Sequence, residues 1–175
     1  MSDTKKIAVM VILARIDDRL IHGQVVEGWV NFLKATCILV ADDTVAANPL
    51  QRAIIEISVP EGLKVIIGNV EEICGKLLSS SLDAERAILL FSNPVDALRS
   101  CEAGLSFSSV NLGGLHFVPG KRKIMDVCAV NDADLEALKA ILRRGVKINI
   151  QTVPTEKPQP LEKVFKACLG EAGTK

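Results

Sequence analysis

The chain has 175 residues, of which 49% are apolar and only 3% aromatic, so its core is expected to consist of aliphatic side chains. Its 21 basic residues balance its 21 acidic ones, so no overall charge favours a nucleic-acid or anionic-membrane partner, and none is predicted. The five cysteines contain no C-x-x-C pair, which argues against a disulfide framework or a zinc site and favours the reducing cytoplasm.

The first apolar run, residues 7–14, is too short to span a bilayer, which needs about 20 residues, and predicts a strand buried on both faces. A charged stretch, residues 15–22, follows, and helical spacing of apolar residues then predicts a helix over residues 23–34. Further strands are predicted at residues 36–41, 63–67, 86–91, 108–112 and 146–153. Further helices are predicted after Asn48, Asn69 and Asn93 and over residues 133–144 and 161–169, with a hairpin in residues 113–130 around Pro119 to Arg122.

This alternation of strands and helices predicts a single α/β domain over residues 1–175, with helices on both faces of a mainly parallel sheet of six to seven strands. In such a fold the ligand site lies beyond the carboxyl ends of the strands. The loops expected at that edge are residues 15–22, 42–48, 68–70, 92–94 and 112–115.

The charged stretch carries His22 at or near the start of a helix, where free backbone N–H groups and the helix dipole favour an anion. Arg15 and Arg19 add fork-shaped donors that suit phosphate oxygens. Gly23 and Gln24 begin the helix, and Gly23 lets the backbone approach a bound group closely. These residues together fit phosphoryl transfer to an imidazole nitrogen.

A carboxylate is expected to orient the imidazole of His22 or to hold an arginine. Asp17 and Asp18 are both candidates, and Asp18 is preferred because it lies four residues before His22. On spacing alone, the alternative is an ordinary surface loop that happens to contain a histidine.

Other polar residues near predicted strand ends have two interpretations each. Gly113 and Gly114 form either a backbone nest for phosphate or a tight turn. Ser92 and Asn93 either contact phosphate or cap a helix. The pair at residues 42–43 is too small a ligand set for a metal, so no metal site is predicted. The second histidine, at position 116, has apolar neighbours and is expected to be structural.

The string ARIDDRLIHGQV at residues 14–25 resembles the signature of the IIB components of the mannose/fructose/sorbose family of the bacterial sugar phosphotransferase system. Residues 40–43, 89–94 and 110–114 resemble further blocks of that family in the same order, and the resemblance covers about residues 6–166. It implies a three-layer α/β/α sandwich, His22 as the phosphorylated histidine and residues 15–22 as the phosphate-binding loop. It implies no metal or organic cofactor.

The resemblance also implies the partners. Such proteins accept a phosphoryl group from a IIA phosphohistidine and donate it to a sugar held by the membrane components IIC and IID, without stable insertion into the membrane. The predicted function is therefore that of a cytoplasmic protein-histidine phosphotransferase. Two alternatives stay open: a regulatory phosphocarrier that serves no transporter, and a mutase or phosphatase that works through a phosphohistidine.

Overall fold

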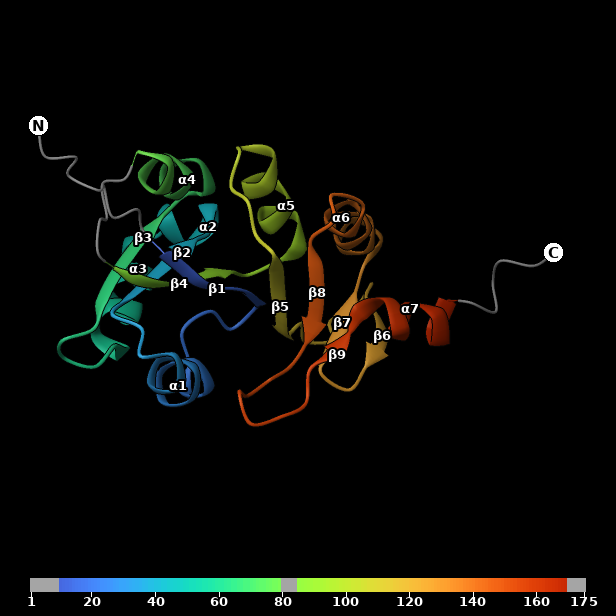
Figure 1. The fold of residues 1–175 in the computed structure, drawn as a ribbon. Helices are drawn as coiled ribbons and strands as arrows, with labels where there is room; N and C mark the ends of the chain where they lie inside the picture. The colour runs from blue at the N-terminus through green and yellow to red at the C-terminus, as the bar shows by residue number, and fades with distance from the viewer. Residues whose placement is uncertain (1–9, 80–84, 170–175) are drawn as a thin grey trace, which may run out of the picture.

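The computed structural model describes residues 10–79 and 85–169, so residues 7–9 of the first predicted strand lie outside the described part. A seven-stranded sheet in the order β3-β2-β4-β1-β5-β8-β9 crosses the molecule, and β6 pairs with β7 in a separate antiparallel hairpin (Figure 1). The strands are β1 (Met10–Asp17), β2 (Cys37–Ala41), β3 (Lys64–Gly68), β4 (Arg86–Phe91), β5 (Ser109–Gly114), β6 (Arg122–Met125), β7 (Cys128–Val130), β8 (Lys147–Ile150) and β9 (Gln159–Pro160). Neighbouring strands of the large sheet are parallel except β8 and β9, which confirms the mainly parallel α/β architecture.

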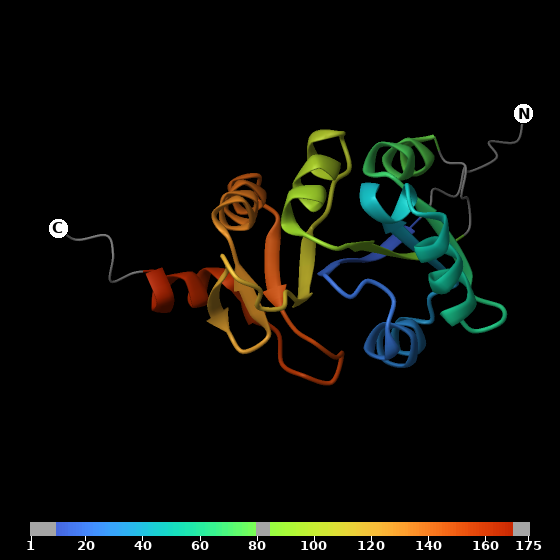
Figure 2. The ribbon, with the colours of Figure 1, turned by 180° about the vertical axis from the view of Figure 1, so that it is seen from behind.

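Helices cover both faces of the large sheet. They are η1 (Gln24–Val30), a π-helix, and the α-helices α1 (Asn31–Leu33), α2 (Asp43–Ala46), α3 (Pro49–Ser58), α4 (Val70–Leu78), α5 (Pro94–Glu102), α6 (Asp132–Arg143) and α7 (Leu161–Leu169). Helices α4, α5 and α6 lie along one face, and η1 with α1 lies on the other, as both views show (Figures 1 and 2). The predicted three-layer sandwich is therefore confirmed.

The central strands β2 and β4 alternate their side chains between two apolar cores because successive residues of a strand point to opposite faces. Leu39 and Leu89 belong to the core under α4, α5 and α6, whereas Ile38 and Ile88 belong to the core shared with η1. All four side chains are fully buried. No helix in the two described segments is long and apolar enough to cross a membrane.

Asparagine caps fix the starts of the main helices, as their positions in the sequence predict. The side chains of Asn48, Asn69, Asn93 and Asn131 each accept a hydrogen bond from a backbone N–H in the first turn of α3, α4, α5 and α6. The short helix α2 was not predicted, and Asp42 caps it.

Four predicted boundaries are wrong, and two of them matter for the site. Strand β5 continues to Gly114, so Gly113 and Gly114 lie in a strand and not in a tight turn. Strand β1 continues to Asp17, because its last residues pair with both β4 and β5, so Arg15 and Asp17 lie in the strand and not in a loop. The start of β1 is also less buried than predicted, since Met10 is exposed. The turn of the β6–β7 hairpin lies at residues 126–127, not around Pro119 to Arg122, and β8 is shorter than the predicted 146–153.

Candidate functional site

The candidate site lies where β1 ends between its two parallel neighbours. Arg15 is in register with Asn111 of β5, and Asp17 is in register with Gly114. The chain then turns sharply at Leu20, which is buried and has the positive φ of 54° that few residues other than glycine adopt. This strained turn brings the following histidine back over the strand end.

Asp17 is the centre of the site. Its carboxylate has no exposed surface and accepts hydrogen bonds from three side chains: Nη2 of Arg15 at 2.7 Å, Nε and Nη2 of Arg19 at 3.1 Å each, and Nε2 of His22 at 3.0 Å. The backbone N–H of Arg19 donates a further bond at 3.2 Å. Asp17 therefore holds both arginines and the histidine in one cluster.

The charge state of Asp17 determines which ring nitrogen of His22 carries a proton. Burial alone would raise the pKa of Asp17, but the hydrogen bonds from His22 and Arg19 and the charge of Arg15 together hold that pKa well below its usual range. An ionised carboxylate only accepts hydrogen bonds, so Nε2 of His22 carries the proton that lies between them. In a neutral imidazole with this tautomer, the other ring nitrogen, Nδ1, has the free electron pair.

His22 has limited access to solvent, with 16% of its side chain exposed. A cavity of about 290 Å³ opens beside it, and a Cβ added at Gly23 would meet no atom within 4 Å. This space admits a reacting group next to the imidazole. The cavity is lined by Ile21, His22, Gly23, Val26, Glu27, Ser58 and Pro60.

Arg19 is the accessible arginine of the site, with 36% of its side chain exposed. Its Nη2 also donates to Oε1 of Gln24 at 3.0 Å, so the start of η1 is tied to the loop. Arg19, Gln24 and Gly114 line a second cavity of about 190 Å³, on the side of β5. Arg19 is thus placed to meet an anion that enters the site.

Arg15, in contrast, is fully buried, and the expectation that it clamps phosphate directly does not fit its surroundings. Its Nη1 donates to Oδ1 of Asn111 at 2.5 Å and to the carbonyl of Gln151 at 3.0 Å. Its Nη2 donates to Asp17 and to the carbonyl of Thr152 at 3.2 Å. Its guanidinium also lies over the Trp29 ring, with Cζ 5.6 Å from the ring centre.

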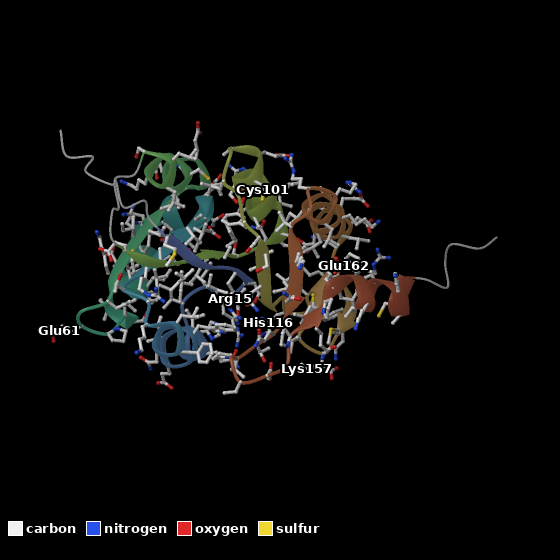
Figure 3. The ribbon with its side chains drawn as sticks, viewed as in Figure 1. Arg15, Glu61, Cys101, His116, Lys157 and Glu162 are labelled. Carbon is white, nitrogen blue, oxygen red and sulfur yellow. The ribbon has the colours of Figure 1, made fainter. Side chains whose placement is uncertain are left out.

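Asp18 does not orient His22, contrary to the preference stated for it. Both oxygens of its carboxylate bind His116, one accepting from the backbone N–H and the other facing Nδ1, each at 2.6 Å. These bonds satisfy His116, as expected of a structural histidine, although its side chain is exposed and lines the second cavity together with Arg19 (Figure 3). Asp17 makes the ring contact because it ends the strand, whereas Asp18 already points outward.

Ser92 and Asn93 lie at the end of β4, but their hydrogen bonds lead away from His22. The hydroxyl of Ser92 donates to Asp42, and Asn93 caps α5 and donates to Asp96. The helix-cap interpretation therefore accounts for Asn93. Among the described residues, no cluster of three or more His, Cys, Asp or Glu side chains could hold a metal ion.

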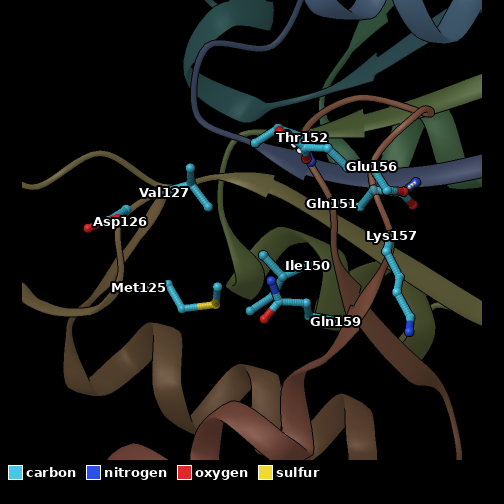
Figure 4. A pocket seen from close by; sticks show the side chains of 9 residues that line it. All are labelled: Met125, Asp126, Val127, Ile150, Gln151, Thr152, Glu156, Lys157 and Gln159. Carbon is cyan, nitrogen blue, oxygen red and sulfur yellow. Dashed lines mark hydrogen bonds between the residues drawn. The ribbon is translucent and has the colours of Figure 1, made fainter.

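Sequence reasoning missed Asn111, Trp29 and the segment at residues 151–152 as parts of the site. Trp29 donates from Nε1 to the carbonyl of Thr152 at 3.0 Å, beside the bonds from Arg15. Residues 151–152 also line a cavity of about 650 Å³ that adjoins the site through Asp126 and Val127 (Figure 4). The contacts at residues 151–152 use backbone carbonyls, which carry no signal in the sequence. Asn111 uses its side chain, and only its position two residues before Gly113 and Gly114 marked its strand end.

Comparison with known proteins decides the family. Residues 11–173 match the family model described as "PTS system sorbose subfamily IIB component". The chain belongs to this family. It is accordingly a IIB component of the sorbose/mannose class of the phosphotransferase system.

Relatives and solved structures of this IIB family agree. The chain is 36% identical over 148 residues to the mannose-specific EIIAB component of Escherichia coli strain K12; the match covers 84% of this chain and 46% of that protein, so the chain spans about half its length. It is 33% identical to the N-acetylgalactosamine-specific phosphotransferase enzyme IIB component 2 of the same strain, covering 89% and 97% of the two chains. The crystal structure of the IIBSor domain of the Klebsiella pneumoniae sorbose permease superposes with a TM-score of 0.84 at 28% identity, covering 89% of this chain and 95% of that one.

Proposed function

We propose that His22 accepts a phosphoryl group from the phosphohistidine of a IIA protein and passes it to a sugar that enters through the membrane components IIC and IID. The observation that supports this is the hydrogen bond between Nε2 of His22 and the buried carboxylate of Asp17. It leaves Nδ1 as the nucleophile and fixes the ring beside an accessible arginine. The site thus holds the parts that phosphoryl transfer to an imidazole needs.

In the first step, Nδ1 of His22 attacks phosphorus, the bond from phosphorus to the donor's imidazole breaks, and the donor nitrogen keeps the electron pair. The proton on Nε2 stays in place, and the carboxylate of Asp17 stabilises the positive charge that develops on the His22 ring. Arg19 neutralises charge on the transferring oxygens, with backbone N–H groups of Gly23 and Gln24 as further donors. In the second step the oxygen of a sugar hydroxyl attacks phosphorus, the bond from phosphorus to Nδ1 of His22 breaks with the electron pair left on Nδ1, and the proton of the hydroxyl passes to water.

The roles differ from residue to residue. His22 is the carrier, Arg19 contacts the transferring group, and Asp17 sets the ring. Arg15 does not contact the transferring group; it donates a hydrogen bond to Asp17 and so keeps that carboxylate in place. Gly114 lines the cavity beside Arg19 and leaves it open, whereas we assign no contact with phosphate to Ser92 or Asn93. The transfer takes place at the cytoplasmic side of the membrane.

The test uses the two histidines of the chain as a matched pair. Purified protein is incubated with phosphoenolpyruvate, Enzyme I, the carrier protein and IIA, and acid-labile, alkali-stable label is mapped by mass spectrometry. His22→Ala is expected to abolish the label, because the nucleophile is lost, while His116→Ala retains it. Label on the His22→Ala protein at the wild-type level would refute the assignment.

The same preparation separates transport from regulation. Addition of membranes that contain IIC and IID, with the sugar, is expected to discharge the label from His22. Label that persists with every sugar tested would instead identify a regulatory phosphocarrier.

A further inference from the structure

The segment Asn111-Leu112-Gly113-Gly114 has a function that the phosphate-nest interpretation does not explain. It forms the end of β5, directly beside the end of β1, and parallel pairing places Asn111 level with Arg15. The side chain of Arg15 is fully buried near His22, and the residues at the end of β5 are in a position to keep it there.

Asn111 fits this task through both ends of its amide. Its Oδ1 accepts from Nη1 of Arg15 at 2.5 Å, and its Nδ2 donates to the carbonyl of Gln151 at 3.1 Å. A guanidinium only donates and a carbonyl only accepts, so the amide has one orientation that satisfies both partners. At 6% exposure, loss of either bond leaves a polar group buried without a partner.

Gly113 also helps to place Arg15, because it has no side chain where the guanidinium lies. A Cβ built on it would lie 2.5 Å from Nε of Arg15 and would overlap Cζ and Nη2 even more closely. Its φ is not among the positive values found in the described residues, so the backbone itself would accept alanine. The absence of a side chain at Gly113 therefore leaves the space that the guanidinium of Arg15 occupies.

We propose that residues 111–114 are the seat of Arg15, and that Asn111 and Gly113 are positioning residues for His22. They hold Arg15, Arg15 holds Asp17 at 2.7 Å, and Asp17 holds Nε2 of His22 at 3.0 Å. Neither residue touches the phosphoryl group. This inference rests on the proposed function for its catalytic consequence, but the placement of the ring is a property of the unphosphorylated protein.

The test is a double-mutant cycle of Gly113→Ala and Arg15→Ala, with Gly75→Ala on α4 as the control for adding a methyl group in open space. Each protein is labelled with ¹⁵N-histidine, and NMR reports which nitrogen of His22 carries the proton. The rate of phosphorylation by IIA is measured in parallel. Gly113→Ala is expected to slow phosphorylation about 100-fold, as a displacement of about 1 Å does, and to mix the two ring tautomers.

In the Arg15→Ala background the added methyl group has nothing to displace. Gly113→Ala is then expected to change the rate by no more than about twofold and to leave the ring spectrum unchanged. A loss of rate that is equally large with and without Arg15 would overturn the proposal and restore the phosphate nest. A wild-type spectrum and rate in the single Gly113→Ala protein would also overturn it.

Asn111→Leu, which keeps the number and branching of the side-chain heavy atoms, covers the case in which Gly113→Ala does not fold. It is expected to lower the rate about tenfold and to shift the His22 ring signals, because Arg15 loses one partner. Unchanged ring signals in a folded Asn111→Leu protein would refute the seat. If the wild-type protein takes no phosphoryl group at all, the proposed function fails, while the ring spectra still decide whether the seat exists.

Discussion

At the scale of single residues, the ionisation of the buried carboxylate of Asp17 makes the stability of the folded protein depend on pH. Hydrogen bonds from His22 and Arg19 and the charge of Arg15 outweigh burial and lower its pKa in the folded protein. The stabilisation is therefore complete above the unfolded-state pKa of about 3.9 and is lost as the pH falls through the lower folded-state pKa.

Asp17→Asn tests this coupling. It leaves Arg15 buried beside a neutral group, so we expect the free energy of unfolding at neutral pH to fall by about 3–5 kcal/mol. Below about pH 4 the wild-type protein should lose stability more steeply than the variant, because only the wild-type carboxylate takes up a proton. Urea titrations at several pH values give both quantities.

The neighbouring carboxylate supplies the control. Asp18 is partly exposed and pairs with an exposed histidine, so Asp18→Asn is expected to cost at most about 1 kcal/mol. Equal losses for the two variants would contradict the central position given to Asp17.

The sequence pattern alone did not decide whether Asp17 or Asp18 contacts the ring of His22. Two adjacent carboxylates cannot be ranked until the end of the strand is known, and charges at positions 15 and 17 are typical of a loop. Pairing of β1 with β4 and β5 kept these residues in the sheet, where side chains two apart share a face. Arg15 and Asp17 therefore meet, and Asp18 turns outward.

At the scale of elements, α3 presents branched apolar side chains to solvent on one side and to the core on the other. Leu50, Ile54 and Ile57 are 72%, 58% and 83% exposed, while Ile55 packs against the core shared with η1. Adjacent isoleucines thus have opposite surroundings on the same helix.

We expect Ile54→Gln to change the free energy of unfolding by less than about 0.5 kcal/mol, because the side chain is already solvated. Ile55→Gln is expected to lower it by at least about 1 kcal/mol, since a polar amide replaces buried apolar contacts. Thermal or urea unfolding of the pair measures the difference. A larger loss for Ile54→Gln would show that α3 packs differently.

Helix starts were the most predictable elements, because the physical cause is local: an asparagine oxygen meets a backbone N–H within one turn. Strands β2 and β4 followed from continuous apolar runs, whose residues fill both cores. The π-helical form of η1, the short α2 and the turn of the β6–β7 hairpin did not follow, because packing and long-range pairing decide them.

At the scale of the whole molecule, burial in the apolar interior determines how readily each cysteine thiol reacts. Cys37, Cys74 and Cys128 are buried thiols, and burial raises the pKa of Cys37 to about 11 and of Cys128 to about 12. Cys168 on α7 is exposed. A thiol reacts as the thiolate, so position in the fold sets the order of reaction.

We expect a thiol reagent at neutral pH to modify Cys168 quickly in the native protein and the three buried cysteines only when the chain unfolds. Mass spectrometry of the time course identifies each site. Cys168→Ser should remove the fast phase. Fast modification of Cys37 would instead reveal an opening of the central sheet.

The candidate site was predictable only in part, because it gathers distant positions. The segment of residues 15–24 was found from its charges and its histidine, and that much is local. Three of the partners of Arg15 are 96, 136 and 137 residues away along the chain, and two of these three are backbone carbonyls. Only the sheet order, which puts β1 between β4 and β5, brings them together.

The distance between Arg15 and its partners also bears on synthesis of the protein. A ribosome releases the whole of residues 14–25 long before residues 111 and 151–152 leave its tunnel. Until then the guanidinium of Arg15 lacks its three acceptors at Asn111, Gln151 and Thr152. We therefore expect the hydrogen bonds that hold Arg15 to be complete only in molecules synthesised to about residue 152.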